Sequence, residues 1–456
     1  MATSSDLENI WTIERLVPGG RGLARLPDGR IGFATQVAPG DKIRVLAAKT
    51  HRQFVEASEW TLVEPANDRV HPECPHFNHC GGCDWMHLSR QAELASKRAL
   101  LSDALKRVGK LGEVPPIGLV ADQFPSTDPG YSEVGVAKGY RNRQRFHVSP
   151  SGKIGLFAEK SHQLVEIETC LISHPEVVRG LVVLREALAR RPEVGVWLSE
   201  AEVRISELAP KLAVRLVQRS AGFKPELTRK FVQELEQSFD LVTIGRHRAL
   251  ETQRFAVFED VVVEIPPAAF VQVNPSINAK LVAHVVGRSK ELGIEYFADL
   301  YAGAGNFALP LTAAGMRGVA LEQSRPAVTA ATRQVQALKL DSRLQYILGD
   351  VATGVGALDK ATGSRHRASE TRPFDLVILD PPREGAKDVL TGVLRLTPQH
   401  IAYCACDPVS LARDLKTLTA SGYQLTDVTI FDMFPRTHHF ESVAWLSRGP
   451  LPKERS

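Results

Sequence analysis

The chain has 456 residues, of which 43% are hydrophobic and 24% are charged, as in an ordinary folded globular protein. This length exceeds what one hydrophobic core supports, so we expect about three domains. The formal net charge of +4 permits a nucleic-acid partner without demanding one. Met1–Ile10 has no apolar core, and no run approaches the ~18 apolar residues of a membrane span, so we expect a cytoplasmic protein without a membrane partner.

Residues 1–65 are predicted to be β-rich. Short runs of alternating apolar residues are separated by turn sequences such as Pro18-Gly19-Gly20, Asp28-Gly29 and Pro39-Gly40-Asp41. Five or so short strands in this length indicate a small closed barrel of the OB type. Such a barrel is a common platform for nucleic acid, and a purely scaffolding role is the alternative.

Residues 66–265 are predicted to form a central domain of mixed strands and helices. A helix is expected from Ser89 to Val108, with its lysines and arginines facing solvent or RNA, and residues 112–135 are expected to form a loop. The stretch from Lys138 to His147 alternates basic residues at strand period. It predicts either a surface for phosphates and bases or a plain charged strand face.

The central domain opens with Cys74, Cys80 and Cys83, which are spaced Cys-x5-Cys-x2-Cys. In a reducing compartment, cysteines at ligand spacing indicate a metal or catalysis rather than a disulfide framework. The spacing also differs from the Cys-x3-Cys-x2-Cys of radical-generating clusters, so a structural or RNA-positioning metal group is favoured.

Residues 266–456 alternate between predicted strands and helices, which indicates a parallel doubly wound α/β sheet. The polar segment 352–373 is expected to include an exposed loop. The expected strands are Tyr296–Leu300, Gly318–Leu321, Leu344–Leu348, Phe374–Leu379, Ile401–Cys404, Val428–Phe431 and Ser442–Leu446.

Polar and glycine residues follow the ends of these strands, where open α/β sheets bind ligands. Gly303-Ala304-Gly305 follows the first strand and lacks the third glycine of a dinucleotide fingerprint. Glu322 ends the second strand, where a carboxylate can accept both ribose hydroxyls, and Asp350 ends the third. This arrangement fits S-adenosylmethionine better than NAD. Asp380-Pro381-Pro382-Arg383 is predicted to aim Asp380 over the same edge.

Cys406 ends a later strand and is a candidate nucleophile. Asp407 is expected to cap the following helix and Pro408 to be its first residue. A helix N-terminus favours a thiolate, while the charge of Asp407 opposes it. Cys404 is expected to be a buried apolar residue. Glu441 is a candidate general base, with His438 or His439 as the competing choice.

The C-terminal half resembles the RNA uracil-C5 methyltransferases. The motifs that carry this resemblance are Phe270–Pro275, Asp299–Phe307, Asp380–Arg383, Cys406–Leu415 and Phe434–Glu441. The cysteine segment and the N-terminal β region extend the resemblance to the bacterial ribosomal-RNA members, which carry a TRAM domain and a [4Fe–4S] cluster. The transfer-RNA member typically lacks both.

The resemblance implies a class I, Rossmann-like methyltransferase domain over 266–456, a TRAM barrel over 1–65 and a central α+β domain with an iron–sulfur cluster over 66–265. It implies Cys406 as nucleophile and Glu441 as proton acceptor. The implied donor-site residues are Gln272, Tyr301, Asn306, Glu322, Asp350 and Asp380. The implied cluster ligands are Cys74, Cys80, Cys83 and Cys170.

The expected activity is methyl transfer from S-adenosylmethionine to C5 of a uridine, most consistent with 23S ribosomal RNA. Transfer RNA is the alternative substrate, and a catalytically silent RNA-binding assembly factor is the alternative class. Zinc is the alternative to the cluster, because four cysteines also suit a tetrahedral site. A monomer is the default expectation.

Overall fold

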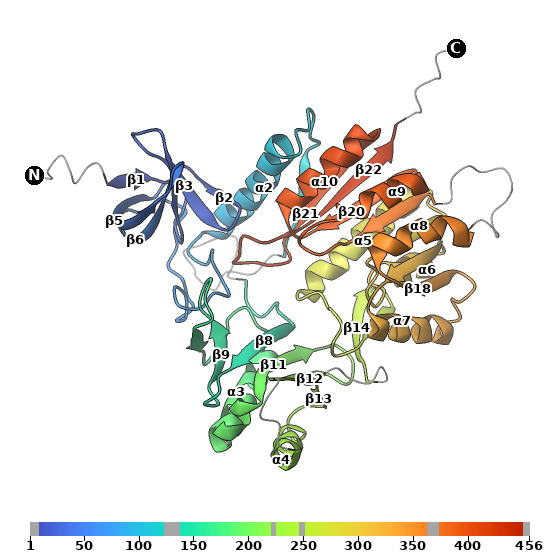
Figure 1. Ribbon diagram of the computed structural model, residues 1–456, viewed down its shortest axis with the longest axis horizontal. Helices are drawn as coiled ribbons and strands as arrows, with labels where there is room; N and C mark the ends of the chain where they lie inside the picture. The colour runs from blue at the N-terminus through green and yellow to red at the C-terminus, as the bar shows by residue number, and fades with distance from the viewer. Residues whose placement is uncertain (1–8, 123–136, 220–224, 246–250, 363–373, 450–456) are drawn as a thin grey trace, which may run out of the picture.

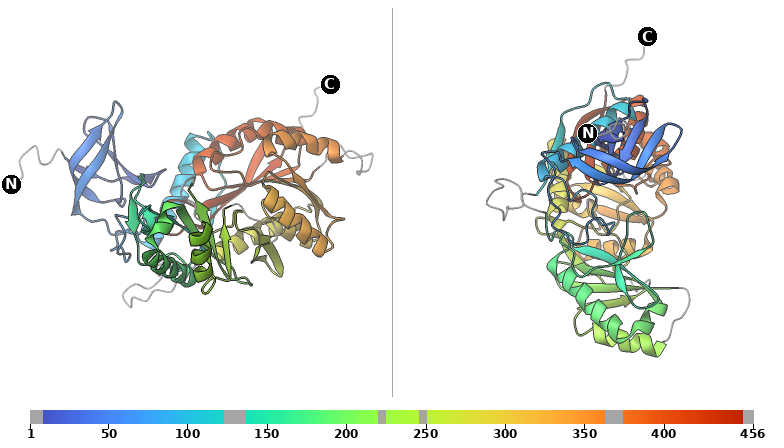
Figure 2. Two further views of the ribbon diagram at one scale, coloured as in Figure 1. Left: turned by 60° about the horizontal axis from the view of Figure 1, so that its bottom comes forward. Right: turned by 90° about the vertical axis from the view of Figure 1, so that its left-hand side faces the viewer.

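The computed structural model of the chain describes residues 9–122, 137–219, 225–245, 251–362 and 374–449 (Figure 1). The expectation drawn from Met1–Ile10 concerns a segment that lies almost entirely outside these residues. Figure 1 shows an N-terminal β unit and a C-terminal α/β unit, with a central unit below them. Figure 2 shows the same units from two other sides.

The N-terminal unit is one sheet in the order β1-β5-β6-β4-β3-β2. Its pairs are antiparallel except β4 with β6. Its core includes Trp11, Ile13, Ile43 and Val55. The strand-rich prediction is confirmed, while the OB type stays a prediction. The strands are β1 Ile10–Thr12, β2 Arg15–Val17, β3 Arg21–Arg25, β4 Ile31–Ala34, β5 Lys42–Thr50 and β6 Phe54–Glu64.

Helix α2 (Arg90–Arg107) confirms the helix predicted after the cysteine segment. Ser89 caps it by accepting a hydrogen bond from the Ala92 N–H at 3.1 Å, which explains where the helix begins. The expected exposed basic face is wrong in part, because Arg90 and Lys97 are buried. The helix packs against α10 (Pro408–Ala420) of the C-terminal unit.

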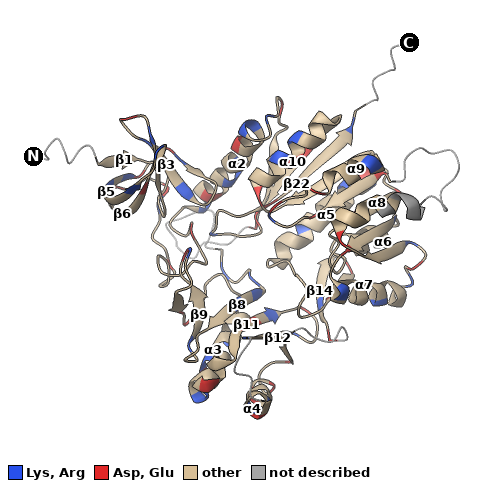
Figure 3. Ribbon diagram, in the orientation of Figure 1, with Lys and Arg blue, Asp and Glu red and all other residues tan. Residues whose placement is uncertain are grey.

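The central unit is a sheet in the order β10-β9-β8-β11-β12-β13, whose core contains Phe146, Trp197 and Phe231. Figure 3 shows basic residues along β8 and β11, interspersed with acidic ones. The strands are β8 Arg143–Val148, β9 Ile154–Phe157, β10 Leu164–Glu166, β11 Leu198–Ile205, β12 Leu212–Gln218 and β13 Leu241–Ile244. The helices are α3 Pro175–Arg190, η1 Pro192–Val196 and α4 Pro225–Leu235.

The basic residues of β8 are partly neutralised. Arg145 approaches Glu202 at 3.5 Å and Glu200 at 3.6 Å, and Arg143 approaches Glu202 at 4.0 Å. Burial, opposed by Glu202, lowers the pKa of Arg143 to about 10. These pairs support the charged-strand alternative at Arg143 and Arg145, and Arg141 of the same stretch precedes the strand.

The C-terminal unit is a sheet in the order β18-β17-β16-β19-β20-β22-β21-β7. Helices α5, α6 and α7 pack on one face, and α8, α9 and α10 pack on the other. The doubly wound α/β prediction is confirmed. The strands are β16 Tyr296–Leu300, β17 Arg317–Glu322, β18 Leu344–Leu348, β19 Leu376–Leu379, β20 His400–Ala405, β21 Tyr423–Phe431 and β22 Glu441–Arg448. The helices are α5 Pro275–Glu291, α6 Ala308–Ala313, α7 Arg325–Ala337, α8 Val351–Thr362 and α9 Leu390–Leu396.

Three features of this unit differ from the prediction. The sheet is not wholly parallel, because β22 runs antiparallel to β20 and β21. The polar segment 352–373 begins as helix α8, and its remainder lies outside the described residues. A hairpin of β14 (Gln253–Phe258) and β15 (Val261–Ile265) packs with α5 and α7 ahead of the sheet.

The stretch 112–135 was expected to be a loop, and this is wrong for β7 (Ile117–Val120). Strand β7 pairs in parallel with β21 and forms an edge of the C-terminal sheet. The methyltransferase-like sheet therefore takes one strand from the region expected to belong to the central domain. No helix in the described ranges has the length and apolar character needed to cross a membrane.

Candidate active site and cysteine cavity

The carboxyl ends of β16 and β17 build the predicted donor edge. Tyr301 and Gly305 both take positive φ, 66° and 110°, as the chain turns away from β16. Glu322 accepts hydrogen bonds from the Gly303 N–H at 3.0 Å and the Ser324 N–H at 2.6 Å. The carboxylate of Glu322 thereby fixes the glycine turn. At Gly305 a Cβ would lie 2.6 Å from the Tyr346 hydroxyl, so the turn leaves no room for a side chain.

A cavity of about 70 Å³ opens beside this turn. It is lined by Gln272, Tyr301, Asn306 and Asp380. Asn306 is held by a reciprocal pair of amide hydrogen bonds with Asn278, at 2.8 and 3.0 Å. The Gln272 Oε1 atom is buried and has no hydrogen-bond partner within the described residues, so it is available to a ligand.

Glu322 and Asp350 do not line this cavity. Glu322 borders it through its bond to Gly303, whereas Asp350 is exposed and accepts a hydrogen bond from the Thr353 N–H at 3.1 Å. Asp350 still acts on the site electrostatically. Burial raises the pKa of Tyr301 to about 12, and the charge of Asp350 contributes to that increase.

Sequence reasoning did not single out two residues of this edge. Asp299 is fully buried at the end of β16 and accepts a hydrogen bond from the Ala308 N–H at 3.1 Å. Burial and the charge of Asp380 raise the pKa of Asp299 well above its usual range. Phe270 is 63% exposed at the cavity rim, with the Arg143 guanidinium 5.4 Å from its ring centre. Phe270 and Asp299 are the first residues of the motifs Phe270–Pro275 and Asp299–Phe307, and that position is the signal that could have found them.

Adjacent antiparallel strands bring Cys406 and Glu441 together. Strand β20 ends at Ala405, which pairs with Ser442 of β22, so the next position along each strand places Cys406 opposite Glu441. The Ser442 hydroxyl donates to the Ala405 carbonyl at 3.1 Å and ties the two strand ends together. The predicted nucleophile and proton acceptor therefore lie side by side.

Burial dominates the electrostatics of this pair. It raises the pKa of Cys406 to about 12, with the charge of Glu441 adding to the increase and that of Arg383 opposing it. Burial and the charge of Asp380 raise the pKa of Glu441 well above its usual range. Burial also raises the pKa of Asp380 to about 6. The charge of Asp380 raises the pKa of both Cys406 and Glu441, and Asp380 also lines the donor cavity. The Cys406–Glu441 pair and the donor cavity therefore form one acidic site.

The local predictions around Cys406 are confirmed. Asp407 caps α10 by accepting a hydrogen bond from the Ser410 N–H at 2.7 Å, and Pro408 is the first helical residue. Cys404 is buried between the sheet and its covering helices. The two competing histidines differ. His438 pairs with Asp84, whereas burial, together with the charge of His438, lowers the pKa of His439 to about 3.

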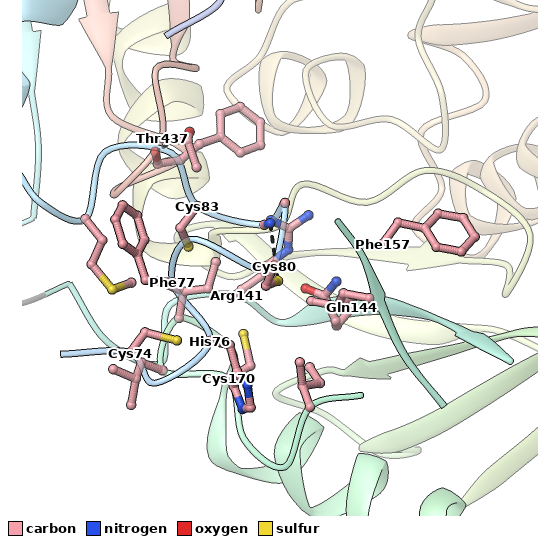
Figure 4. A pocket seen from close by; sticks show the side chains of 18 of the residues that line it. Cys74, His76, Phe77, Cys80, Cys83, Arg141, Gln144, Phe157, Cys170 and Thr437 are labelled. Atoms are coloured by element: carbon pink, nitrogen blue, oxygen red, sulfur yellow. Dashed lines mark hydrogen bonds between the residues drawn. The ribbon is translucent and has the colours of Figure 1, made fainter. Parts of the chain in front are cut away.

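The four cysteines assigned by resemblance border one cavity of about 310 Å³ (Figure 4). Cys74, Cys80 and Cys83 reach it from the segment before α2, and Cys170 reaches it from the segment before α3. Arg383 of the Asp-Pro-Pro turn lines the same cavity. All six cysteines lie within the described residues, and none forms a disulfide.

The sulfur of Cys170 affects the ionisation of the other three thiols across this cavity. Burial raises the pKa of Cys74, Cys80 and Cys83, and the nearby sulfur of Cys170 contributes to each increase. Across the described part of the chain, no His, Cys, Asp or Glu side chains gather in threes closely enough to hold a metal ion. The cysteines thus share a cavity without forming a closed ion site.

The fold is that of the S-adenosylmethionine-dependent methyltransferases, and the comparisons with known proteins place the chain among those that modify RNA. The family model of the tRNA (uracil-5-)-methyltransferases matches residues 193–449, which is more than half of the chain. The chain belongs to the RNA uracil-C5 methyltransferase family and is an enzyme of that S-adenosylmethionine-dependent class.

Curated relatives match along nearly the whole chain. It is 30% identical to the 23S rRNA (uracil(1939)-C(5))-methyltransferase RlmD of Pectobacterium atrosepticum, over 95% of this chain and 92% of that protein. It is 29% identical to an uncharacterised RNA methyltransferase of Thermotoga maritima, over 96% of this chain and 98% of that protein.

A solved structure shares the fold. The Pyrococcus abyssi tRNA (uracil-54, C5)-methyltransferase, in complex with S-adenosyl-L-homocysteine, superposes with a TM-score of 0.68 at 23% identity. The match covers 96% of this chain and 100% of that chain. The α/β methyltransferase fold is thereby established.

Proposed function

We propose that this protein transfers a methyl group from S-adenosylmethionine to C5 of a specific uridine in 23S ribosomal RNA. The observation that carries the proposal is the placement of Cys406 opposite Glu441, beside a cavity that Asp380 lines. The named function of the RlmD relatives supports ribosomal RNA as the substrate.

The chemistry follows from the weak nucleophilicity of uracil C5. The Cys406 thiolate adds to C6, and the electron pair of the C5–C6 double bond then makes C5 nucleophilic. C5 attacks the methyl group of the sulfonium donor, whose sulfur leaves as a neutral thioether. Glu441 accepts the C5 proton, and elimination of Cys406 restores the double bond. The uridine must be unstacked to expose C6 to the thiolate.

The donor is proposed to occupy the cavity beside the glycine turn. Glu322 would accept the ribose hydroxyls, and the free Gln272 Oε1 and the Asn306 amide would contact polar groups of the donor. Tyr301 would pack on it, with Asp350 and Asp380 completing the acidic surroundings. A cationic donor suits these carboxylates, because its positive charge reduces the repulsion between their closely spaced negative charges.

We also propose a [4Fe–4S] cluster on Cys74, Cys80, Cys83 and Cys170. Four thiols around one cavity of about 310 Å³ supply the donor set and room for such a cluster. Zinc is the second candidate, and a single ion would require the sulfurs to draw closer together. We assign the cluster a structural or RNA-positioning role, because its cavity is bordered by Arg141 and Arg383.

The domains proposed are 1–65 as a TRAM-type RNA-binding barrel, 66–265 as the cluster-bearing unit and 266–456 as the catalytic unit. Strand β7 is the exception, because it belongs to the catalytic sheet. We propose that the protein acts as a monomer.

The test is methyl transfer from labelled S-adenosylmethionine to separated ribosomal and transfer RNA that lack 5-methyluridine, followed by nucleoside analysis. Label in 5-methyluridine of ribosomal RNA is expected. Label from transfer RNA would keep the chemistry and change the substrate. Donor binding without transfer to either RNA would favour a silent assembly factor.

Two substitutions test the roles of the paired residues. Cys406→Ala is expected to abolish both turnover and any covalent RNA adduct, because it removes the attacking sulfur. Glu441→Gln is expected to trap a methylated covalent adduct, because the C5 proton stays in place. Normal turnover by Glu441→Gln, with no adduct on a denaturing gel, would show that another group removes the proton.

A further inference from the structure

The segment between β21 and β22 ends just before Glu441, and we call its residues 432–438 the tail turn. Arg436 lies in it with φ 68° although it is not glycine, and it is only 4% exposed. A bulky residue in the left-handed region is unfavourable, because its Cβ comes too close to the following carbonyl oxygen. Such a conformation persists only where the surroundings hold it.

The surroundings include a buried ion cluster formed with helix α2. Lys97 donates to Asp432 Oδ1 at 2.6 Å, to Glu93 Oε1 at 2.8 Å and to the Phe434 carbonyl at 3.1 Å. The same Glu93 Oε1 accepts the Arg436 backbone N–H at 2.8 Å, and Arg90 pairs with both Glu93 and Asp432. The side chains of Glu93, Lys97 and Asp432 are completely buried.

These contacts bind one backbone segment at several points. Asp432 is fixed at the end of β21, where its N–H also donates to the Val120 carbonyl at 2.9 Å. The Phe434 carbonyl and the Arg436 N–H are then held by Lys97 and Glu93. Since Glu441 follows within a few residues, the cluster determines where the chain enters β22.

The segment that bears the cysteines holds the other side of the tail turn. The Trp85 N–H donates to the Arg436 carbonyl at 3.1 Å, and the His438 N–H donates to Asp84 at 3.1 Å. The Tyr140 hydroxyl donates to the Pro435 carbonyl at 3.0 Å. The turn is therefore enclosed by α2, by Asp84 and Trp85 next to Cys83, and by Tyr140.

Stability alone is a weak reason for such a cluster. Removing charged groups from water is costly, and apolar residues of similar volume are often equally stabilising. Charged groups with fixed hydrogen bonds specify one geometry, however, and here they act on backbone atoms. Lys97 and Glu93 are both ionised at neutral pH: burial lowers the pKa of Lys97 only to about 8. Burial also opposes ionisation of Glu93, but the charges of Lys97 and Arg90 hold its pKa at about 2.

We propose that Glu93, Lys97 and Asp432 are positioning residues that hold the tail turn so that the Glu441 carboxylate lies beside Cys406 when the C5 proton is removed. The inference rests on the proposed role of Glu441. Helix α2, which lies far from Glu441 in the sequence, would thereby control the removal of the C5 proton.

The experiment measures the step itself, using the full-length protein with its metal group intact. Lys97→Met removes the cation with little change in side-chain length, and Asp432→Asn keeps the shape while removing the charge. Each is expected to lower kcat by roughly ten- to a hundredfold, as expected for a displaced catalytic group. The Kd for S-adenosylhomocysteine should stay within about twofold, because neither substitution touches the donor cavity, whereas KM for RNA should fall together with kcat once proton removal is the slowest step.

The decisive readout is the covalent adduct. Slow proton removal leaves the methylated uridine attached to Cys406, so both variants should accumulate a denaturation-resistant RNA–protein band that carries the methyl label. Leu101→Ala is the matched control: it removes a fully buried side chain of α2 and leaves the charges in place. It should lower thermal stability without accumulating the adduct.

Reduced activity in Lys97→Met and Asp432→Asn with no more adduct than in Leu101→Ala would overturn the proposal and leave the role of Glu441 intact. Unchanged kcat in Asp432→Asn would overturn it as well. If Glu441→Gln turns over normally and traps no adduct, the base assignment itself is wrong, and the positioning proposal fails with it.

Discussion

Cys406 is a half-buried thiol whose neighbours are mostly acidic. Its pKa of about 12 reflects burial first and Glu441 second, so the thiol is protonated in the free protein at neutral pH. A nucleophile in this state requires a change in its surroundings before it attacks. A sulfonium donor near Asp380 would bring a positive charge, which favours the thiolate.

Alkylation of Cys406 tests this electrostatic argument. Without ligand, the rate of modification by iodoacetamide should rise about tenfold for each pH unit between about pH 6.5 and 9, because the thiolate fraction grows with pH below the pKa. S-Adenosylmethionine should accelerate the modification relative to S-adenosylhomocysteine, which lacks the positive charge. Peptide mass spectrometry would report Cys406 separately from the other cysteines.

A rate that levels off below pH 8 would contradict the high pKa of Cys406. Equal rates with the two ligands would show that donor charge does not control this thiol. Cys406→Ala supplies the background at that peptide.

Residue identities at this site could be predicted to different degrees. The placement of Cys406 and Glu441 at adjacent strand ends was predictable, because each lies in a recognisable motif, and their catalytic roles stay predictions. Cys170 was identified only by resemblance, since nothing in its own segment has ligand spacing, and only the fold brings it to the cavity. The burial of Lys97 was not predictable, because a lysine on a helix is usually exposed and its partner Asp432 lies far along the chain.

Among the elements, helix ends were predicted best. Ser89 and Asp407 each accept a backbone N–H at the start of a helix, and this signal is local in the sequence. Strand direction was predicted less well. The antiparallel placement of β22 depends on where the chain returns to the sheet, which hydrophobic periodicity does not encode.

Helix α10 also supports the turn that carries Arg383. Asp414 is 1% exposed and accepts hydrogen bonds from the Tyr403 hydroxyl and the Ala386 N–H, both at 2.7 Å. Arg413, which pairs with Asp414, donates to the Glu384 carbonyl at 2.7 Å. One carboxylate thus joins α10, β20 and the segment after the Asp-Pro-Pro motif.

Asp414→Asn is expected to destabilise the protein by about 2 kcal/mol, because the amide cannot replace every bond that the carboxylate accepts. The midpoint of thermal unfolding should fall by about 4–8 °C. Tyr403→Phe removes one hydroxyl and should cost about 1 kcal/mol. Calorimetry would show whether Asp414→Asn lowers the stability more than Tyr403→Phe does. An equal loss of stability in the two variants would contradict the central role of Asp414.

At the scale of the whole molecule, the cysteine cavity lies between the central unit and the C-terminal unit, and Trp85 beside it contacts the N-terminal unit. Trp85 donates from its indole Nε1–H to the Gly20 carbonyl of the N-terminal sheet at 3.1 Å, and the tail turn borders the cavity through Thr437 (Figure 4). Loss of a group bound at this cavity is therefore expected to loosen the junction and to reduce activity.

Metal content would test the group proposed there. Protein purified without oxygen should contain about four iron atoms per chain if a [4Fe–4S] cluster is bound. Cys83→Ser should lower the iron content, whereas Cys404→Ser, which alters a cysteine away from the cavity, should retain it. Zinc in place of iron would select the alternative, and equal iron in both variants would contradict the ligand assignment.

Strand β7 has a consequence for synthesis on the ribosome. It is made early in the chain, yet its partner β21 and the strand β22 beside that partner are made last. At about 5–20 residues per second, the nascent β7 segment waits for tens of seconds before its partner exists. During that interval the emerging chain must keep an unpaired, apolar strand from pairing elsewhere, which makes this enzyme a candidate client for chaperones that bind nascent chains.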